Sequence, residues 1–234
     1  ALYVVCKFKP TLVIGTGGYA SGPILFIASK FKIPCLIQEQ NSYPGITNRI
    51  LGKYVDKVCV AYDNMDKFFI KEKIFFTGNP IREDILECKD EIPTDINNFF
   101  VRNQDPAILV IGGSLGAKTI NQAISNNIDI LKEKKINIIW QTGLSYYSEA
   151  LRLVKESKAK NIKVFDFIKK MDKAYTMADI IVSRAGAIAI SELCCIGKPV
   201  ILIPSPNVAE NHQYKNAQSL VNKKAAILVE DKEA

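Results

Sequence analysis

Hydrophobic residues along this chain gather in short, β-branched runs that alternate with longer stretches of mixed polarity. Short apolar runs bounded by Gly, Pro or Asn are typical of buried parallel strands, and the longer stretches are typical of helices. The alternation predicts an α/β fold whose parallel sheets carry helices on both faces. We expect strands at residues 12–14, 35–38, 57–61, 73–77, 107–111, 136–141, 161–165, 180–182 and 200–203, and helices at residues 1–9, 24–32, 45–54, 63–69, 117–131, 145–157, 171–177 and 187–196.

The segment GNPIR indicates a boundary between two such domains. Asn79 can cap a helix, and Pro80 can take its first position. We therefore expect residues 1–78 and 79–234 to form two Rossmann-like domains, each with a glycine-rich turn between a strand and a helix. Residues 88–106 are polar and predict a loop.

The most informative stretch covers residues 178–217, where the pattern predicts strand, tight turn, helix, strand, long loop and helix. Gly186 in the tight turn has no Cβ, so the backbone there can approach a ligand closely. The first N–H groups of the helix from residue 187 have no partner within the helix, and the helix dipole adds partial positive charge. A diphosphate or a sugar hydroxyl can use those donors.

Glu192 follows in the same helix, about a turn and a half from its start. A carboxylate there can accept two hydrogen bonds from a ribose diol, although its spacing equally fits a solvated helix residue. The loop at residues 204–212, together with Gln213 and Asn216, is expected to close the other side of this site.

Composition narrows the class of protein. The chain has 234 residues, of which 48% are hydrophobic and 24% charged, enough for a sizeable core. No apolar run is long enough to span a membrane, and no signal-peptide pattern is present. Six cysteines without a C-x-x-C pair lie in or beside apolar segments, which predicts reduced, packed thiols of a cytoplasmic protein. A single histidine and the lack of an Asp-x-Asp after a strand predict that no metal and no cofactor is bound.

The net charge of +7 is unevenly distributed. Residues 1–80 hold 10 Lys and Arg against 5 Asp and Glu, which favours an anionic partner, although a merely soluble basic surface is common. No basic stretch has the interleaved aromatic residues that would indicate nucleic acid. Four lysines flank residues 24–27 and two phenylalanines, a pattern typical of a surface that binds anionic lipid. Residues 24–27 would equally fit packing on the sheet. The lysines are Lys7, Lys9, Lys30 and Lys32, and the phenylalanines are Phe8 and Phe31.

The stretch SRAGAIAISE, followed by GKP and by HQYKNA, resembles the nucleotide-sugar signature of the MurG family of peptidoglycan N-acetylglucosaminyltransferases. Four further motifs resemble the same family in the same order: GTGGYASGP, QEQNSYPGITNR, GNPIR and GGSLGA. Together they cover nearly the whole chain. The sequence departs from the family at Gln38, where the family has histidine, and at His212, where it often has glutamine; the role of His212 is therefore open.

The resemblance implies a GT-B glycosyltransferase, with two Rossmann-like domains whose parallel sheets face each other across a cleft. The implied reaction moves N-acetylglucosamine from UDP-N-acetylglucosamine to the C4 hydroxyl of lipid I, undecaprenyl-diphosphoryl-N-acetylmuramyl pentapeptide, with inversion and formation of lipid II. Such an enzyme works in peptidoglycan synthesis as a peripheral protein on the cytoplasmic face of the bacterial plasma membrane. By the same resemblance, residues 1–78 would face the acceptor and the membrane, and residues 79–234 would bind the UDP-sugar.

The resemblance also implies how the nucleotide would be bound. Glu192 would hold the ribose, the backbone of Phe167 and Ile168 would bracket the uracil, and Ser114 would meet the diphosphate.

Further contacts implied by the resemblance involve the helix start and the sugar. Ala187 and Ile188 would offer amides at the start of their helix, and Gln213 and Asn41 would contact the sugar. Two arginines would line the cleft: Arg82 and Arg184.

The catalytic base is less clear. In the family, a histidine in a glycine-rich GGTGGH loop is placed near the acceptor, and this sequence has no such motif. We therefore expect that base to lie before the first residue here, with Glu39 as the candidate within the chain. The N-terminal domain shows about four strands and both ends look truncated, so we expect the chain alone to bind the donor without turnover.

Two other functions fit parts of the sequence. Gly15-x-Gly17-x-x-Ala20 after a strand, with Glu39 after the next strand, matches the fingerprint of a nicotinamide-dependent oxidoreductase. That reading leaves GGSLGA and SRAGAIAISE unexplained. The other alternative is a non-catalytic UDP-sugar-binding subunit that needs a partner chain.

Overall fold

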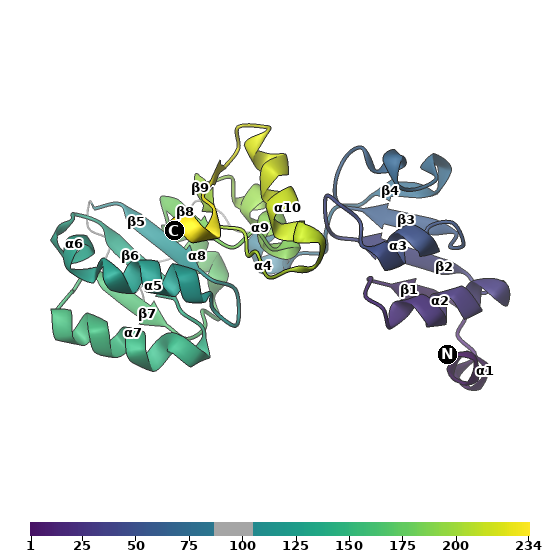
Figure 1. Ribbon diagram of the computed structural model, residues 1–234, viewed down its shortest axis with the longest axis horizontal. Coiled ribbons are helices and arrows are strands. Elements are labelled where there is room, and N and C mark those ends of the chain that lie inside the picture. The colour runs from purple at the N-terminus through teal and green to yellow at the C-terminus, as the bar shows by residue number, and fades with distance from the viewer. Residues whose placement is uncertain (87–104) are drawn as a thin grey trace. The chain divides into compact units, whose positions relative to one another are not determined.

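The two sheets of the computed structural model belong to two separate units of the chain (Figure 1). The structure describes residues 1–86 and 105–234. Unit 1 comprises Ala1–Pro80 and unit 2 comprises Ile81–Ala234. The loop expected at residues 88–106 lies outside the described residues, apart from its last two. Within the described parts of the chain, no helix is long and apolar enough to cross a membrane.

Unit 1 contains a parallel sheet whose four strands lie in chain order, β1-β2-β3-β4. Helix α2 packs on this sheet through Leu25 and Ala28, which are fully buried. A Cβ on Gly15 would lie 2.1 Å from the Cδ1 atom of Leu25, so α2 packs closely against the end of β1. The elements are α1 (Leu2–Phe8), β1 (Val13–Gly15), α2 (Ser21–Lys30), β2 (Cys35–Glu39), α3 (Ile46–Leu51), β3 (Lys57–Val60) and β4 (Ile74–Phe76).

The hydrophobic core of unit 1 lies on one face of its sheet. Ile37 and Val58 belong to this core, with Leu25 of α2 packed in the same cluster. On the opposite face, Ile14 is 60% exposed and Phe75 is 44% exposed. Among the described residues of unit 1, the expectation of helices on both faces of the sheet is therefore wrong.

The helix expected at residues 63–69 is also wrong, because only a 3₁₀ turn, Met65–Lys67, forms there. Asn64 before it adopts a left-handed backbone with a φ of 60°. Met65 and Phe69 both turn into the core, so tertiary packing overrides the local helical pattern in this short connection.

Unit 2 contains a six-stranded parallel sheet in the order β10-β9-β8-β5-β6-β7. The chain starts at the centre with β5, moves outward to β6 and β7, then returns to the other side of β5 and moves outward again through β8, β9 and β10. This is the strand order of a doubly wound Rossmann sheet. The strands are β5 (Ala107–Ile111), β6 (Asn137–Gln141), β7 (Ile162–Phe165), β8 (Ile180–Ser183), β9 (Val200–Leu202) and β10 (Ile227–Leu228).

Helices cover both faces of this second sheet, as expected from the sequence. Leu109 and Ile111 of β5 pack with α4, α8, α9 and α10, whereas Val110 between them packs with α5, α6 and α7. Alternating residues of one central strand thus reach two separate cores. The helices are α4 (Glu83–Leu86), α5 (Lys118–Asn126), α6 (Ile128–Glu133), α7 (Leu144–Ser157), α8 (Met171–Met177), α9 (Ala187–Ile196) and α10 (His212–Val221).

Two helix boundaries differ from the expectation because asparagine side chains bind backbone oxygens. Asn127 interrupts the helix expected over residues 117–131, and its Nδ2 atom donates to the oxygen of Ala123 at 2.8 Å. Asn79 does not cap a helix at Pro80: its Nδ2 donates to the oxygen of Gln40 at 3.0 Å, and α4 begins later.

The cysteines are less buried than expected. Cys35 is buried, but Cys6, Cys194 and Cys195 are exposed, and all five described cysteines are free thiols. The prediction of packed thiols is therefore wrong for these three exposed residues.

Glu39 organises the loop that follows β2. Its side chain is buried, with the whole residue 2% exposed, and its two oxygens accept four hydrogen bonds. Oε1 accepts from the backbone and side-chain nitrogens of Asn41 at 3.0 and 3.2 Å. Oε2 accepts from the Gly45 amide at 3.2 Å and from Asn48 Nδ2 at 2.8 Å. The carboxylate thus ties β2 to the start of α3.

We predict that Glu39→Ala destabilises unit 1 by about 3–5 kcal/mol, because the donors that now bind the carboxylate would remain buried without it. Urea denaturation followed by circular dichroism measures the change. Glu72→Ala replaces an exposed glutamate of the same unit and should stay within about 0.5 kcal/mol of the original chain. Equal stabilities of the two variants would contradict a structural role for Glu39.

Candidate functional site

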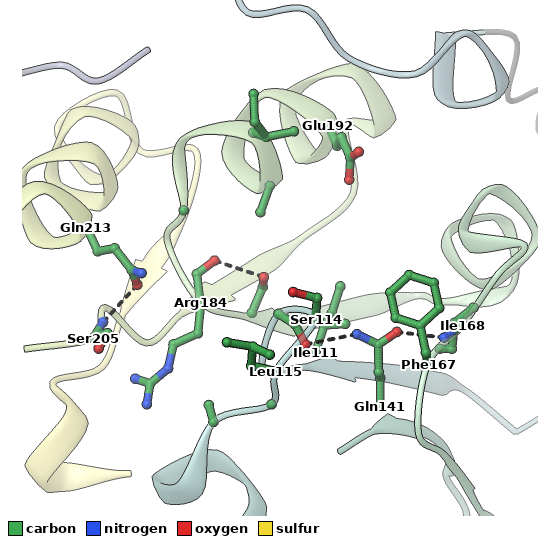
Figure 2. A pocket seen from close by; sticks show the side chains of 18 of the residues that line it. Ile111, Ser114, Leu115, Gln141, Phe167, Ile168, Arg184, Glu192, Ser205 and Gln213 are labelled. Atoms are coloured by element: carbon green, nitrogen blue, oxygen red, sulfur yellow. Dashed lines mark hydrogen bonds between the residues drawn. The ribbon is translucent and has the colours of Figure 1, made fainter. Parts of the chain in front are cut away.

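A pocket of about 870 Å³ opens where the chain of unit 2 switches direction across its sheet. The carboxyl ends of β5 and β8 are neighbours there, and doubly wound sheets bind ligands at that edge. Figure 2 shows side chains from separate segments around the same space. All of the lining residues belong to unit 2. They come from the ends of β5, β6 and β8, the turn after β5 with the start of α5, the segment before α8 with α8 itself, helix α9, the loop after β9, and the residues around Arg82, Gln213 and Asp231.

The glycine turn after β5 is held against the turn after β6. Gly116 has a φ of +80°, and a Cβ there would lie 1.9 Å from the oxygen of Thr142. A Cβ on Gly143 would lie 2.4 Å from the oxygen of Leu115. Both positions therefore require glycine for the two turns to touch. Gly113, with a φ of +85°, would meet nothing within 4 Å, so this part of the turn faces open space.

Gln141 connects the glycine turn to the opposite wall of the pocket (Figure 2). Its Nε2 donates to the oxygen of Gly113 at 3.1 Å, and its Oε1 accepts from the Ile168 amide at 2.8 Å. The side chain is almost fully buried at the end of β6. A buried carboxamide with both ends bonded fixes the spacing of the two segments that it joins.

Two helices begin at the edge of the pocket. Helix α9 starts after Gly186, whose backbone is extended (φ −65°, ψ 147°), and Ile188 and Ala189 in its first turn line the pocket. Helix α5 starts with Lys118 and Thr119, which also line it. Neither helix has a side-chain cap at its N-terminus. Their first-turn amides and dipoles therefore offer hydrogen-bond donors and partial positive charge to an anion.

Glu192 lines the pocket from the second turn of α9, and its carboxylate points into the space toward the glycine turn (Figure 2). Side chains of a helix lean toward its N-terminus, which explains how a residue this far along reaches the same site. Its Oε2 accepts a hydrogen bond from the Tyr175 hydroxyl at 3.1 Å. Burial, then the charge of Glu192 and its hydrogen bond, raise the pKa of Tyr175, against a smaller opposing effect of Arg82.

Arg184 and Asp231 form an ion pair at the other side of the pocket. The same guanidinium nitrogen donates to the oxygen of Ile203 at 3.0 Å. The second oxygen of Asp231 accepts from the Thr119 hydroxyl at 2.9 Å, so this carboxylate joins the end of β8 to the start of α5. Arg184, one of the two arginines that the resemblance placed in the cleft, therefore lines the pocket and is paired with a carboxylate of the same unit.

Gln213 fixes the loop after β9. Its Oε1 accepts from the Ser205 amide at 2.9 Å (Figure 2). It also accepts from the Ala185 amide at 3.3 Å. The nitrogen of the same carboxamide is left for a ligand. His212 beside it starts α10, and its Nε2 lies 3.5 Å from Oε2 of Glu210.

Eight of the ten substrate-binding residues expected from the sequence line this one pocket: Arg82, Ser114, Phe167, Ile168, Arg184, Ile188, Glu192 and Gln213. Ala187 lies between two lining residues, Gly186 and Ile188. Asn41 belongs to unit 1 and is held by Glu39. Glu39, the expected candidate base, is itself committed to that buried network.

The backbone amides of the segment expected to bracket the uracil already have hydrogen-bond acceptors within the chain. The Phe167 amide donates to its neighbour Asp166 at 2.7 Å, and the Ile168 amide donates to Gln141. The phenyl ring of Phe167 is half exposed and stands at the pocket opposite Glu192 (Figure 2). This ring is accessible to a ligand in the pocket.

Sequence reasoning missed Gln141, Tyr175 and Asp231. Gln141 carried a usable signal, because it ends a predicted strand next to the central strand, at the edge where such sheets bind ligands. Tyr175 lies in a short helix with no distinguishing motif, and Asp231 follows the last strand. Their places in the pocket depend on contacts between segments far apart in the chain.

A doubly wound domain with a glycine turn and helix starts at its switch point has the architecture of the Rossmann class. The sequence profile of the glycosyltransferase family 28 C-terminal domain matches residues 107–234, and that of the family 28 N-terminal domain matches residues 1–60. The chain belongs to glycosyltransferase family 28.

The comparisons with single proteins agree with this family. The chain is 50% identical over 97% of its length to the UDP-N-acetylglucosamine–N-acetylmuramyl-(pentapeptide) pyrophosphoryl-undecaprenol N-acetylglucosamine transferase of Parabacteroides distasonis, of which it covers 62%. It is 52% identical, again over 97% of its length, to the protein of the same name from Porphyromonas gingivalis, of which it covers 60%. The chain thus spans about three fifths of these curated relatives.

Among solved structures, the crystal structure of Acinetobacter baumannii MurG matches the chain with a TM-score of 0.77 and 30% sequence identity. The match covers 100% of this chain and 63% of that one. The fold class expected from the sequence, α/β of the GT-B type with parallel sheets, is confirmed.

We predict that Gly186→Ala leaves folding nearly intact but weakens binding of UDP, the nucleotide that the sequence resemblance implies. Its φ of −65° suits alanine and a Cβ would meet no atom within 4 Å, so stability should change by less than about 1 kcal/mol. A methyl group would occupy ligand space at the α9 start, at a cost of about 1–3 kcal/mol, or roughly five- to 150-fold in affinity.

The matched control is Gly45→Ala, because Gly45 also precedes a helix with an extended backbone (φ −63°, ψ 152°) and open surroundings, but lies in unit 1. Thermal melting and calorimetric titration with UDP measure both quantities. Equal UDP affinities of the two variants would show that the ligand does not approach the α9 start.

Proposed function

We propose that this chain carries the donor site of an inverting glycosyltransferase that moves N-acetylglucosamine from UDP-N-acetylglucosamine to the C4 hydroxyl of lipid I. One observation carries the proposal: six residues expected to bind the donor, and two arginines expected to line the cleft, come from separate segments and line a single pocket at the switch point of unit 2. The names of relatives at about 50% identity support the same donor and acceptor. The product would be lipid II, a precursor of peptidoglycan.

In this proposal the pocket binds the donor by its three parts. Glu192 accepts hydrogen bonds from the two ribose hydroxyls, and Phe167 with Ile168 contacts the uracil. The diphosphate lies between Ser114 and the first amides of α9, where the helix dipole favours negative charge. Those donors also stabilise the charge that develops on the diphosphate as the sugar leaves, which lowers the barrier to transfer. Gln213 would offer its amide nitrogen to the sugar.

The acceptor hydroxyl must lose a proton as it attacks, and a general base typically contributes 10²–10⁴-fold to the rate. Glu39 is poorly suited, because all four of its hydrogen bonds serve the loop after β2. His212 lies beside Glu210 and is absent from the lining of the pocket. We therefore assign the base to no described residue.

The same contacts weaken the oxidoreductase alternative. A nicotinamide site needs an acidic residue after the second strand with its carboxylate free for the ribose. Glu39 has the required place in the sequence, but it is buried and fully engaged. The UDP-sugar-binding subunit shares the donor pocket but would need a partner chain for turnover. Because the chain alone is expected to bind the donor without turnover in either case, a pull-down that captures such a partner chain is the test of this alternative.

We predict that calorimetry detects binding of UDP and UDP-N-acetylglucosamine, both with EDTA and with Mg²⁺, and no binding of NADH. Glu192→Ala should weaken UDP by roughly 2–4 kcal/mol, or about 30- to 1000-fold, because hydrogen bonds to a charged group contribute about 1.5–3 kcal/mol each. Glu156→Ala, an exposed glutamate on α7, serves as the control. Unchanged UDP affinity in a folded Glu192→Ala variant would refute the donor site.

We further propose that unit 1 contacts the anionic cytoplasmic face of the plasma membrane through a surface formed by α1 and α2. Phe8 is 79% exposed, and Phe31 just after α2 is also exposed. The Lys30 ammonium lies 5.3 Å from the ring centre of Phe26, so basic and aromatic groups share this surface. Leu25, by contrast, packs on the sheet, as its alternative interpretation expected. Exposed aromatic residues beside lysines suit the interface of an anionic bilayer.

We predict that Phe8→Ser with Phe31→Ser reduces sedimentation with anionic vesicles about tenfold or more, because two apolar side chains would no longer enter the interface. Binding by the original chain should weaken as salt is raised, and vesicles of neutral lipid should bind less. Leu144→Ser removes an equally exposed apolar residue from unit 2 and is the control. If cosedimentation changes neither with the two phenylalanine substitutions nor with salt, the proposed surface is wrong.

A further inference from the structure

The contact between Tyr175 and Glu192 joins the core of unit 2 to the pocket. The ring of Tyr175 lies in the hydrophobic cluster beneath α8 and α9, and the residue is 1% exposed. Its hydroxyl reaches Oε2 of Glu192 at 3.1 Å, and both residues line the pocket. The two come from different helices, α8 and α9, so their meeting is a product of the tertiary fold.

We propose that Tyr175 is a positioning residue that orients the Glu192 carboxylate, and that the pair selects ribonucleotides over 2′-deoxyribonucleotides. The inference rests on the proposed function, in which Glu192 holds the ribose. It adds a second residue to the ribose contact and a stated specificity for the sugar of the nucleotide.

One of the two carboxylate oxygens of Glu192 is bonded within the protein. Oε2 accepts a hydrogen bond from the Tyr175 hydroxyl. This bond requires that the hydroxyl keeps its proton. Burial and the neighbouring carboxylate raise the pKa of Tyr175, so the proton stays in place at neutral pH. The carboxylate stands at the pocket (Figure 2), where its other lone pairs can accept hydrogen bonds from a ligand. Vicinal hydroxyls are donors matched to such a carboxylate, whereas a 2′-deoxyribose leaves one acceptor position without a donor.

Positioning matters because a glutamate side chain has three rotatable bonds. Ordering such a side chain upon binding costs free energy, and a contact that orders it beforehand removes part of that cost. The ring of Tyr175 is packed among buried residues of the core, including Ile190 of α9, so it provides a rigid point of attachment. A loose carboxylate would bind either sugar weakly and would distinguish them less.

The test is calorimetric titration of the whole chain with UDP and with 2′-deoxy-UDP. In the original protein UDP should bind more tightly. Tyr175→Phe removes one oxygen atom, and we expect UDP affinity to fall about three- to tenfold and the UDP/2′-deoxy-UDP affinity ratio to shrink at least about threefold. The matched control is Tyr146→Phe, which removes a hydroxyl bonded to Ser125 at 3.0 Å in the same unit and away from the pocket. It should leave the ratio unchanged.

A double-mutant cycle separates positioning from a purely structural role. If Tyr175 acts through Glu192, then Tyr175→Phe should change UDP affinity less than about twofold in a Glu192→Ala background. An unchanged ratio in Tyr175→Phe, or an equal loss of affinity with and without Glu192, would overturn the inference. Thermal melting shows that each variant is folded.

The same titrations distinguish this inference from the proposed function. If Glu192→Ala loses UDP affinity while Tyr175→Phe matches the original chain, the donor site stands and the positioning role is refuted. If Glu192→Ala binds UDP as the original chain does, both are refuted.

Discussion

The pocket of unit 2 depends on one topological constraint: the carboxyl ends of β5 and β8 are adjacent, while the chain leaves them toward opposite faces of the sheet. The helix after β5 packs on one face and the helix after β8 on the other. The turns that lead into these helices must therefore diverge, and the space between them is open to a ligand. Both helices begin at this edge, so their positive ends meet there without any charged residue being needed.

Close backbone packing keeps that space in shape. The turn after β5 touches the turn after β6 at distances that only glycine allows, and Gln141 joins the first turn to the segment before α8. Two carboxylates stand in a pocket proposed for an anionic ligand, and each has an internal donor: Arg184 for Asp231 and Tyr175 for Glu192. The acidic groups are thus held in defined positions by donors of the chain itself.

Unit 1 shows why a motif has to be interpreted through its site. Its glycine turn and the acidic residue after the next strand match a dinucleotide fingerprint in spacing. In the folded chain, Glu39 is buried and bonds to the loop that contains Asn41 and Gly45. The residues that match the fingerprint therefore stabilise a loop in this protein. The contacts of the side chain, and not its spacing in the sequence, decide its role.

The sequence by itself determined the alternation of strands and helices and the parallel sheets, because hydrophobic period and glycine turns are local properties of the chain. Eight of the residues that line the pocket were implied by the family resemblance of their motifs. The sequence did not determine where local and tertiary preferences compete. Residues 63–69 do not form the expected helix, because Met65 and Phe69 pack into the core. Asn127 interrupts another expected helix, because its side chain donates to a backbone oxygen of that helix. Only the tertiary structure placed Tyr175 on Glu192, Gln141 between two walls and Asp231 on Arg184, because those partners are set by how segments distant in sequence pack.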